Sequence, residues 1–155
     1  MNKLPSRNFQ VSGRVVHGDS YGKKLGFPTA NLDRRDYVRR GLKVRLGVYA
    51  GGVIVAEAIG LQNNGGQPAR RSLGEVGWPP LHRKMYVAAI VIGPLDKHHL
   101  PKLEAHLIGF KGNLYGKKIV ITLGKFIRPF KKFSSEIELK AQIKKDIKNI
   151  KKLEK

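Results

Sequence analysis

The sequence contains no cysteine among its 155 residues. Disulfide bonds, thiolate metal sites and a cysteine nucleophile are therefore excluded, which suits a reducing compartment. The chain also has no uninterrupted apolar run near the roughly 20 residues that a membrane-spanning helix needs, and its first residues lack the apolar core of a signal peptide. We therefore expect a soluble, cytoplasmic protein.

Acidic residues are scarce. Only 11 aspartates and glutamates stand against 31 lysines and arginines, which gives a formal net charge of +20. A charge of this size attracts polyanions, so nucleic acid is one candidate partner. The basic residues are spread along the chain, however, and dispersed charge is typical of a solvated surface. We expect that the positive charge reflects a proteome that is basic in general, or serves to attract ATP, and does not indicate dedicated RNA binding.

Several common catalytic signatures are missing as well. The five histidines show no His-x-x-x-His spacing and no accompanying carboxylate cluster, so we do not expect a zinc site. The phosphate-loop and dinucleotide glycine patterns are also absent, so the common nucleotide-binding folds lose their signature.

The length fits one domain with one core, which we expect to span 1–155. Gly51-Gly52 is predicted to be a hairpin turn. Short strands separated by turn signals predict a small closed barrel. The β-branched or alternating character of strands recurs in segments 9–17, 44–61, 84–92, 103–110 and 117–127.

Two segments depart from this strand pattern. Residues 62–84 carry repeated glycine and proline without a period, and we predict a long surface loop that orders over bound ligands as a lid. Ser135 with Glu138 forms a capping-box pattern, and apolar residues then recur at helical spacing. We expect an amphipathic helix over about 135–153 to pack on the barrel, within a core of about 9–150.

The most informative stretch runs from residue 13 to 31, where a strand signal leads into glycines at 18, 22 and 26. Glycines take positive φ and let the main chain approach a ligand, so N–H groups here can point at phosphate oxygens while Lys23 or Lys24 adds charge. Thr29 and Asn31 share one face of an extended segment and can hold a hard cation. A glycine-rich hairpin turn without a ligand explains the same spacing equally well.

A second candidate segment is Leu103-Glu104-Ala105-His106-Leu107. Strand alternation puts Glu104 and His106 on the face opposite the apolar residues. A carboxylate in this setting can act as the general base in phosphoryl transfer to an alcohol, although a merely solvated glutamate is the commoner outcome. Arg128 can hold a phosphate or be an ordinary surface arginine.

The hexapeptide Gly-Phe-Pro-Thr-Ala-Asn at 26–31 resembles the motif that closes the phosphate and metal loop of the bacterial-type riboflavin kinases, or flavokinases. The resemblance covers about residues 11–150. Further segments match the family in the same order, namely 47–50, 103–107, 112–117, and 126–128 with Phe133.

The resemblance implies a six-stranded Greek-key barrel with a C-terminal helix, acting as a riboflavin kinase that makes FMN from riboflavin and ATP with Mg²⁺ or a similar cation. It implies that Glu104 is the catalytic base, that Arg128 contacts the flavin, and that Thr29 and Asn31 hold the metal. The implied nucleotide-binding residues are Gly18, Lys24, Gly26, Pro28, Thr29 and Asn31.

Two departures from the family pattern fall beside the implied flavin cleft. Phe130 stands where many members carry a glutamate, and residues 88–95 lack an asparagine and a threonine of the family. One alternative is therefore a degenerate kinase that binds flavin and turns over poorly. Another is a basic barrel that binds RNA without catalysis, with affinity that falls steeply with salt.

Many bacterial members carry an adenylyltransferase domain ahead of the kinase. Because this chain begins shortly before the first expected strand, we expect that it does not supply the second activity. We also expect a monomer without a membrane partner.

Overall fold

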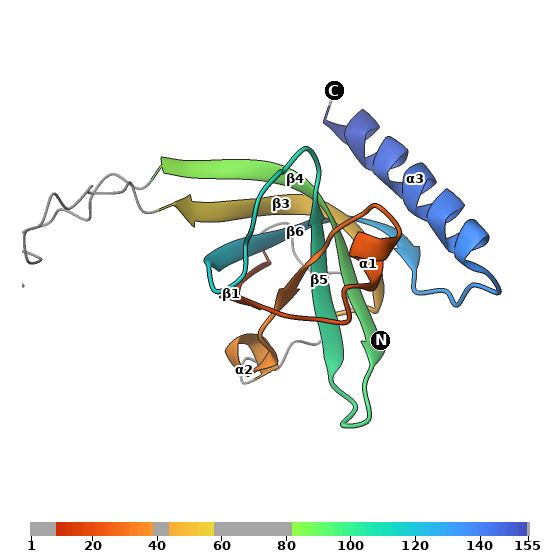
Figure 1. The fold of residues 1–155 in the computed structure, drawn as a ribbon, viewed down its shortest axis with the longest axis horizontal. Coiled ribbons are helices and arrows are strands. Elements are labelled where there is room, and N and C mark those ends of the chain that lie inside the picture. The colour runs from red at the N-terminus through yellow and green to blue at the C-terminus, as the bar shows by residue number, and fades with distance from the viewer. Residues whose placement is uncertain (1–8, 39–43, 58–81, 155) are drawn as a thin grey trace, which may run out of the picture.

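A computed structural model of the protein describes residues 9–38, 44–57 and 82–154. Within these residues, six strands form a closed barrel and a long helix follows the last strand (Figure 1). The strands are β1 (Gln10–Val16), β2 (Ala30–Leu32), β3 (Gly47–Glu57), β4 (His82–Leu95), β5 (Pro101–Leu107) and β6 (Lys118–Pro129). The helices are α1 (Tyr21–Lys24), α2 (Arg34–Tyr37) and α3 (Glu136–Leu153).

The barrel has a Greek-key order. Its strands follow one another as β1-β2-β5-β4-β3-β6, every pair is antiparallel, and β6 pairs back onto β1. Consecutive strands β3, β4 and β5 are neighbours, and β6 returns to lie beside β3, which is the Greek-key arrangement. The predicted mainly β barrel with a C-terminal helix is confirmed.

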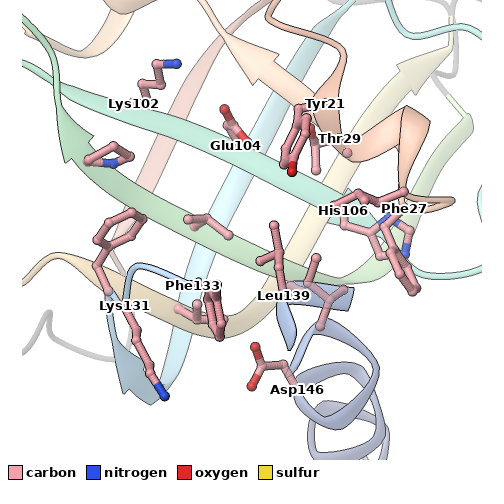
Figure 2. A pocket seen from close by; sticks show the side chains of 18 of the residues that line it. Tyr21, Phe27, Thr29, Lys102, Glu104, His106, Lys131, Phe133, Leu139 and Asp146 are labelled. Carbon is pink, nitrogen blue, oxygen red and sulfur yellow. The ribbon is translucent and has the colours of Figure 1, made fainter. Parts of the chain in front are cut away.

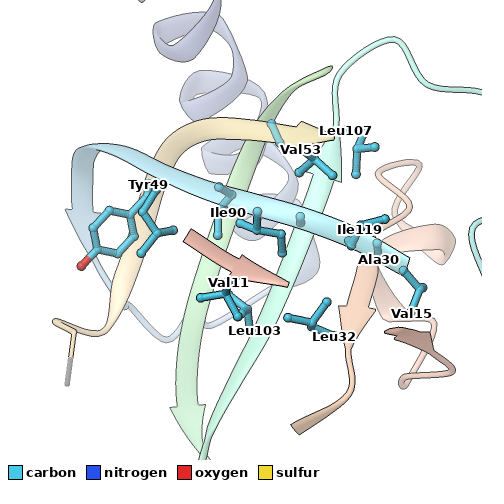
Figure 3. Close-up of a cluster of buried hydrophobic side chains, with 14 of the residues drawn as sticks. Val11, Val15, Ala30, Leu32, Tyr49, Val53, Ile90, Leu103, Leu107 and Ile119 are labelled. Carbon is cyan, nitrogen blue, oxygen red and sulfur yellow. The ribbon is translucent and has the colours of Figure 1, made fainter. Parts of the chain in front are cut away.

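The barrel interior is filled by apolar side chains from alternate strand positions (Figure 3). On β1 the inward residues are Val11 and Val15, each 2% exposed, while Arg14 between them faces solvent. On β6, Ile119 and Ile121 are fully buried. This period of two is what a strand with one buried face requires, so the barrel follows directly from the β-branched pattern.

Two boundaries of the sequence prediction were wrong. Gly51-Gly52 makes no turn, because β3 continues through both glycines with unbroken pairing to β4. A Cβ at Gly51 would collide with the Thr122 carbonyl on β6, so the glycine serves a close approach between strands. His82 and Arg83 belong to β4 and not to the predicted loop, so the strand begins two residues before its predicted start at Lys84. The rest of that loop, and its predicted role as a lid, lie outside the described residues.

Helix α3 begins where the capping pattern predicts. The Ser135 hydroxyl accepts a hydrogen bond from the Glu138 N–H at 3.2 Å, while the Glu138 carboxylate accepts one from the Ser134 hydroxyl at 2.7 Å. Near the other end of the helix, Ile150 is 1% exposed and packs with Ala50 and Ala89 of the barrel. The helix therefore lies against the outside of the barrel, as expected.

None of the helices in the described part of the chain has the length and apolar character to cross a membrane.

Candidate active site

Strand β5 separates the core from a large cavity. Leu103, Ala105 and Leu107 point into the core and are at most 5% exposed. Lys102, Glu104 and His106 alternate with them and line a cavity of 670 Å³. We call this the larger cavity (Figure 2). The sequence prediction that Glu104 and His106 share one face is confirmed.

The walls of the larger cavity come from opposite ends of the chain. One wall is the segment around α1, and the other is the N-terminal half of α3 with the residues that lead into it. The Tyr21 hydroxyl donates a hydrogen bond to Glu136 Oε1 at 3.1 Å, which joins the two walls. The glycine spacing predicted only a loop at Tyr21 and gave no sign of this helical turn or of its bond to α3.

Strand pairing brings the proposed metal donors to the proposed base. Asn31 on β2 lies directly opposite Glu104 on β5, and directly opposed residues in a sheet have Cβ atoms roughly 5 Å apart. Both Asn31 and Thr29 line the larger cavity. Thr29 also lines a second, smaller cavity of 510 Å³, so the two cavities adjoin at this residue.

The glycine segment is shaped differently from the prediction. Gly26 has φ +88°, a left-handed conformation that favours glycine, but its N–H donates to Lys23 O at 3.1 Å and does not point at a ligand. Gly18 and Gly22 are not among the described residues with positive φ. A Cβ at Gly18 would overlap the Asn31 amide, so here glycine admits a neighbouring side chain instead.

Of the remaining predicted nucleotide-binding residues, some line the smaller cavity and others do not. Pro28 lines it, and its carbonyl oxygen lies 2.8 Å from His106 Nδ1, which ties the segment to β5. Lys23 also lines the smaller cavity. Lys24 is exposed and, like Gly18, is not among the lining residues described for either cavity.

The far side of the smaller cavity is a turn that was not predicted to line a site. Asn113 and Tyr115 line the cavity, and the Asn113 side chain accepts a hydrogen bond from the Tyr115 N–H at 2.9 Å. The Tyr115 ring stacks on His17 with centroids 3.8 Å apart. The available signal was segment 112–117, which supported the family resemblance but was given no part in the site.

Glu104 combines partial burial with a nearby ion pair. Burial raises the pKa of the Glu104 carboxyl, the neighbouring Lys102 acts to lower it, and Asp19 acts to raise it. Lys102 Nζ lies 2.7 Å from Asp19 Oδ2. No hydrogen bond joins the Glu104 carboxylate to another of the described side chains, so its oxygens can accept a proton from a ligand.

Arg128 lines the larger cavity but is bound to an acid that the sequence analysis missed. Its Nε and Nη2 donate to the carboxylate of Asp146 on α3 at 2.8 to 3.1 Å. Asp146 is 4% exposed. Among alternating lysines in a helix, a single aspartate gave no signal of this partner.

The fold and site together define a small β-barrel with two adjoining cavities, a partly buried carboxylate and neutral oxygen donors between them. The family model described as "Flavokinase: Riboflavin kinase" matches residues 5–154, and the chain belongs to this family.

Similar proteins agree with this assignment. The chain is 37% identical over 153 residues to a "Bifunctional riboflavin kinase/FMN adenylyltransferase" of Buchnera aphidicola subsp. Schizaphis graminum, covering 97% of this chain and 40% of that protein. The chain thus spans about two fifths of the length of the curated relatives it matches.

Two solved structures share the fold. One is titled a crystal structure of riboflavin kinase from Trypanosoma brucei. The aligned region covers 96% of this chain and 80% of that chain, with a TM-score of 0.61 and 23% sequence identity. The other is titled a crystal structure of a macrolide-efflux protein from Streptococcus pneumoniae. The aligned region covers 93% of this chain and 38% of that chain, with a TM-score of 0.66 and 24% sequence identity.

Proposed function

We propose that this chain transfers the γ-phosphoryl group of ATP to the 5′-hydroxyl of riboflavin, giving FMN and ADP. The observation that carries the proposal is the junction of the two cavities at Thr29, beside the opposed pair of Asn31 and Glu104. A phosphate donor in one cavity and an alcohol in the other would meet next to a carboxylate. Family membership and the names of the relatives support these substrates.

The flavin is assigned to the larger cavity and the nucleotide to the smaller. The larger cavity has apolar walls that include Phe133, Leu139 and Ile143, which suit a planar aromatic ring. Arg128 borders the same space and remains the predicted residue for the flavin. Pro28 and Thr29 border the smaller cavity, in keeping with the predicted nucleotide site.

In the proposed reaction Glu104 accepts the proton of the ribityl hydroxyl as the hydroxyl oxygen bonds to the γ-phosphorus. The bond from the γ-phosphorus to the bridging oxygen breaks, and ADP leaves with that electron pair. Because burial raises the pKa of Glu104, its carboxylate is a stronger base than a solvated glutamate. His106 holds Pro28 and has no part in the proton transfer.

Thr29 and Asn31 are proposed to hold Mg²⁺ or a similar divalent cation. The hydroxyl and amide oxygens are hard, neutral donors, and Asn31 is wedged against Gly18 so that its amide has little freedom. The described residues gather no cluster of three or more His, Asp or Glu side chains, so the other ligands would be water and phosphate oxygens, as magnesium prefers. When bound, the ion neutralises charge on the transferred phosphoryl group.

The other nucleotide residues have supporting roles in the proposal. Gly26 bends the main chain before Pro28, and Gly18 makes room for Asn31. Lys24 adds positive charge from the exposed side of α1. We further propose that the protein acts in the cytoplasm and as a monomer. A light-scattering mass near 17.3 kDa for this chain would support the monomer.

The test is to incubate the purified protein with riboflavin, ATP and Mg²⁺ and to separate the flavins by chromatography. FMN should form in proportion to ADP, and omission of ATP should abolish it. Glu154→Gln, at an exposed position at the end of α3, is the matched control for Glu104→Gln. Flavin binding without FMN would indicate the degenerate kinase, whereas salt-sensitive RNA binding without flavin binding would indicate the RNA-binding barrel.

A further inference from the structure

Asp146 is the one buried charged side chain among the residues that the structure describes. It lies in the middle of α3, and its carboxylate accepts hydrogen bonds from Arg128 on β6 and from Gln142 Nε2 at 2.9 Å. The Arg128 side chain is only 19% exposed. A buried charge is costly unless it is fully paired, so the two residues depend on each other.

This ion pair fixes a wall of the larger cavity. Ile143 lies one turn and Leu139 two turns before Asp146 on α3, and all three line the cavity. Figure 2 shows Asp146 and Leu139 together on the helix side of the cavity, across from Glu104. The ion pair therefore joins the apolar wall on α3 to strand β6.

The Arg128 guanidinium is largely occupied by protein partners. Its Nε and Nη2 donate to Asp146, and its Nη1 donates to the Pro129 carbonyl oxygen at 3.2 Å. The guanidinium carbon also lies 5.6 Å from the centre of the Phe133 ring, which lines the same cavity. These contacts orient the Arg128 side chain towards α3 and Phe133.

We propose that Arg128 and Asp146 act as one positioning unit that sets the flavin affinity of the larger cavity by holding α3 and Phe133 in place. The proposal rests on the proposed function, because it assigns the flavin to this cavity. It changes the predicted part of Arg128: the arginine works through Asp146, and its own contact with the flavin contributes little.

A double-mutant cycle tests this coupling. Arg128→Met, Asp146→Leu and the double variant are compared by the KM for riboflavin, the KM for ATP, and riboflavin affinity from fluorescence quenching. Each single variant leaves one buried charge without its partner, and we expect the riboflavin KM to rise about tenfold. The double variant replaces the pair by apolar side chains, and it should recover to within about threefold of the wild type. The KM for ATP should change little throughout.

Asp96→Asn is the matched control. It breaks the ion pair between Arg34 and Asp96, whose residues line neither cavity, so stability can fall without a change in the riboflavin KM. If the single variants do not fold, the double variant decides the question. A positioning role predicts that the double variant binds riboflavin nearly as well as the wild type, whereas direct binding of the flavin by Arg128 predicts that it binds riboflavin weakly.

Additive effects of the two substitutions, or equal rises in both KM values, would overturn the positioning role. If the wild type neither quenches riboflavin fluorescence nor makes FMN, the proposed function fails and this inference falls with it. If the wild type makes FMN and the single variants keep its riboflavin KM, only the inference fails.

Discussion

The two faces of strand β5 differ in what they contribute. The inner face, with Leu103, Ala105 and Leu107, is buried in the barrel core, where removal of apolar surface from water stabilises the fold. The outer face presents Glu104, whose burial disfavours its charged form. One strand thus carries stability on one side and an energetically unfavourable carboxylate on the other. Substitutions on the two faces should therefore separate stability from activity.

The largest effect is expected for Glu104→Gln. The amide keeps the size of the side chain but cannot take the hydroxyl proton, so kcat for FMN formation should fall by about 10² to 10⁴ while the KM for ATP changes little. Stability should stay the same or rise, because no carboxylate charge remains to be buried. An undiminished kcat would show that Glu104 is not the base.

Leu103→Ala should have the opposite profile. Leu103 is 3% exposed, and truncation of a buried leucine costs about 2 to 5 kcal/mol of unfolding free energy. Thermal or urea denaturation measures this loss. At a temperature well below the transition, kcat for the folded protein should match the wild type; a kcat loss comparable to that of Glu104→Gln would contradict the separation of the two faces.

Thr29→Val tests the larger cavity just before the neighbouring strand β2. The substitution removes one hydroxyl oxygen with little change of shape, so activity should fall by roughly tenfold at limiting Mg²⁺ and recover in part as Mg²⁺ is raised. Thr122→Val on β6 is the matched control, since Thr122 lines neither cavity. An unchanged Mg²⁺ titration for Thr29→Val would argue against ligation by Thr29.

The smallest effect is the pH dependence of the outer face. Because the folded-state pKa of Glu104 is raised, the stability contributed by its protonated form is present below the ordinary glutamate pKa and is lost as pH rises through the folded-state value. The melting temperature of Glu104→Gln minus that of the wild type should therefore increase as pH rises from about 4 towards neutrality. The acid limb of wild-type kcat should lie above the usual glutamate range. Parallel melting curves at all pH values would exclude the raised pKa.

The faces of β5 could be predicted from the sequence because they depend on a period of two within five residues. The same local reasoning located β1, β3, β4 and β6 and the start of α3 at Ser135, but it did not find the short strand β2. It failed where the reason for a residue lies far along the chain. Gly51 was read as a turn because its contact, the Thr122 carbonyl, is on another strand. Asp146 was missed because its partner, Arg128, precedes the helix.

The hydrogen bond between Tyr21 and Glu136 has a consequence for synthesis of the protein. A chain emerges from the ribosome from its N-terminus, so one wall of the larger cavity appears long before the other. β1 likewise pairs with β6, which leaves the barrel open until late in translation. A ligand that needs both walls cannot assist the nascent chain, and it stabilises the protein only after α3 has been released and docked.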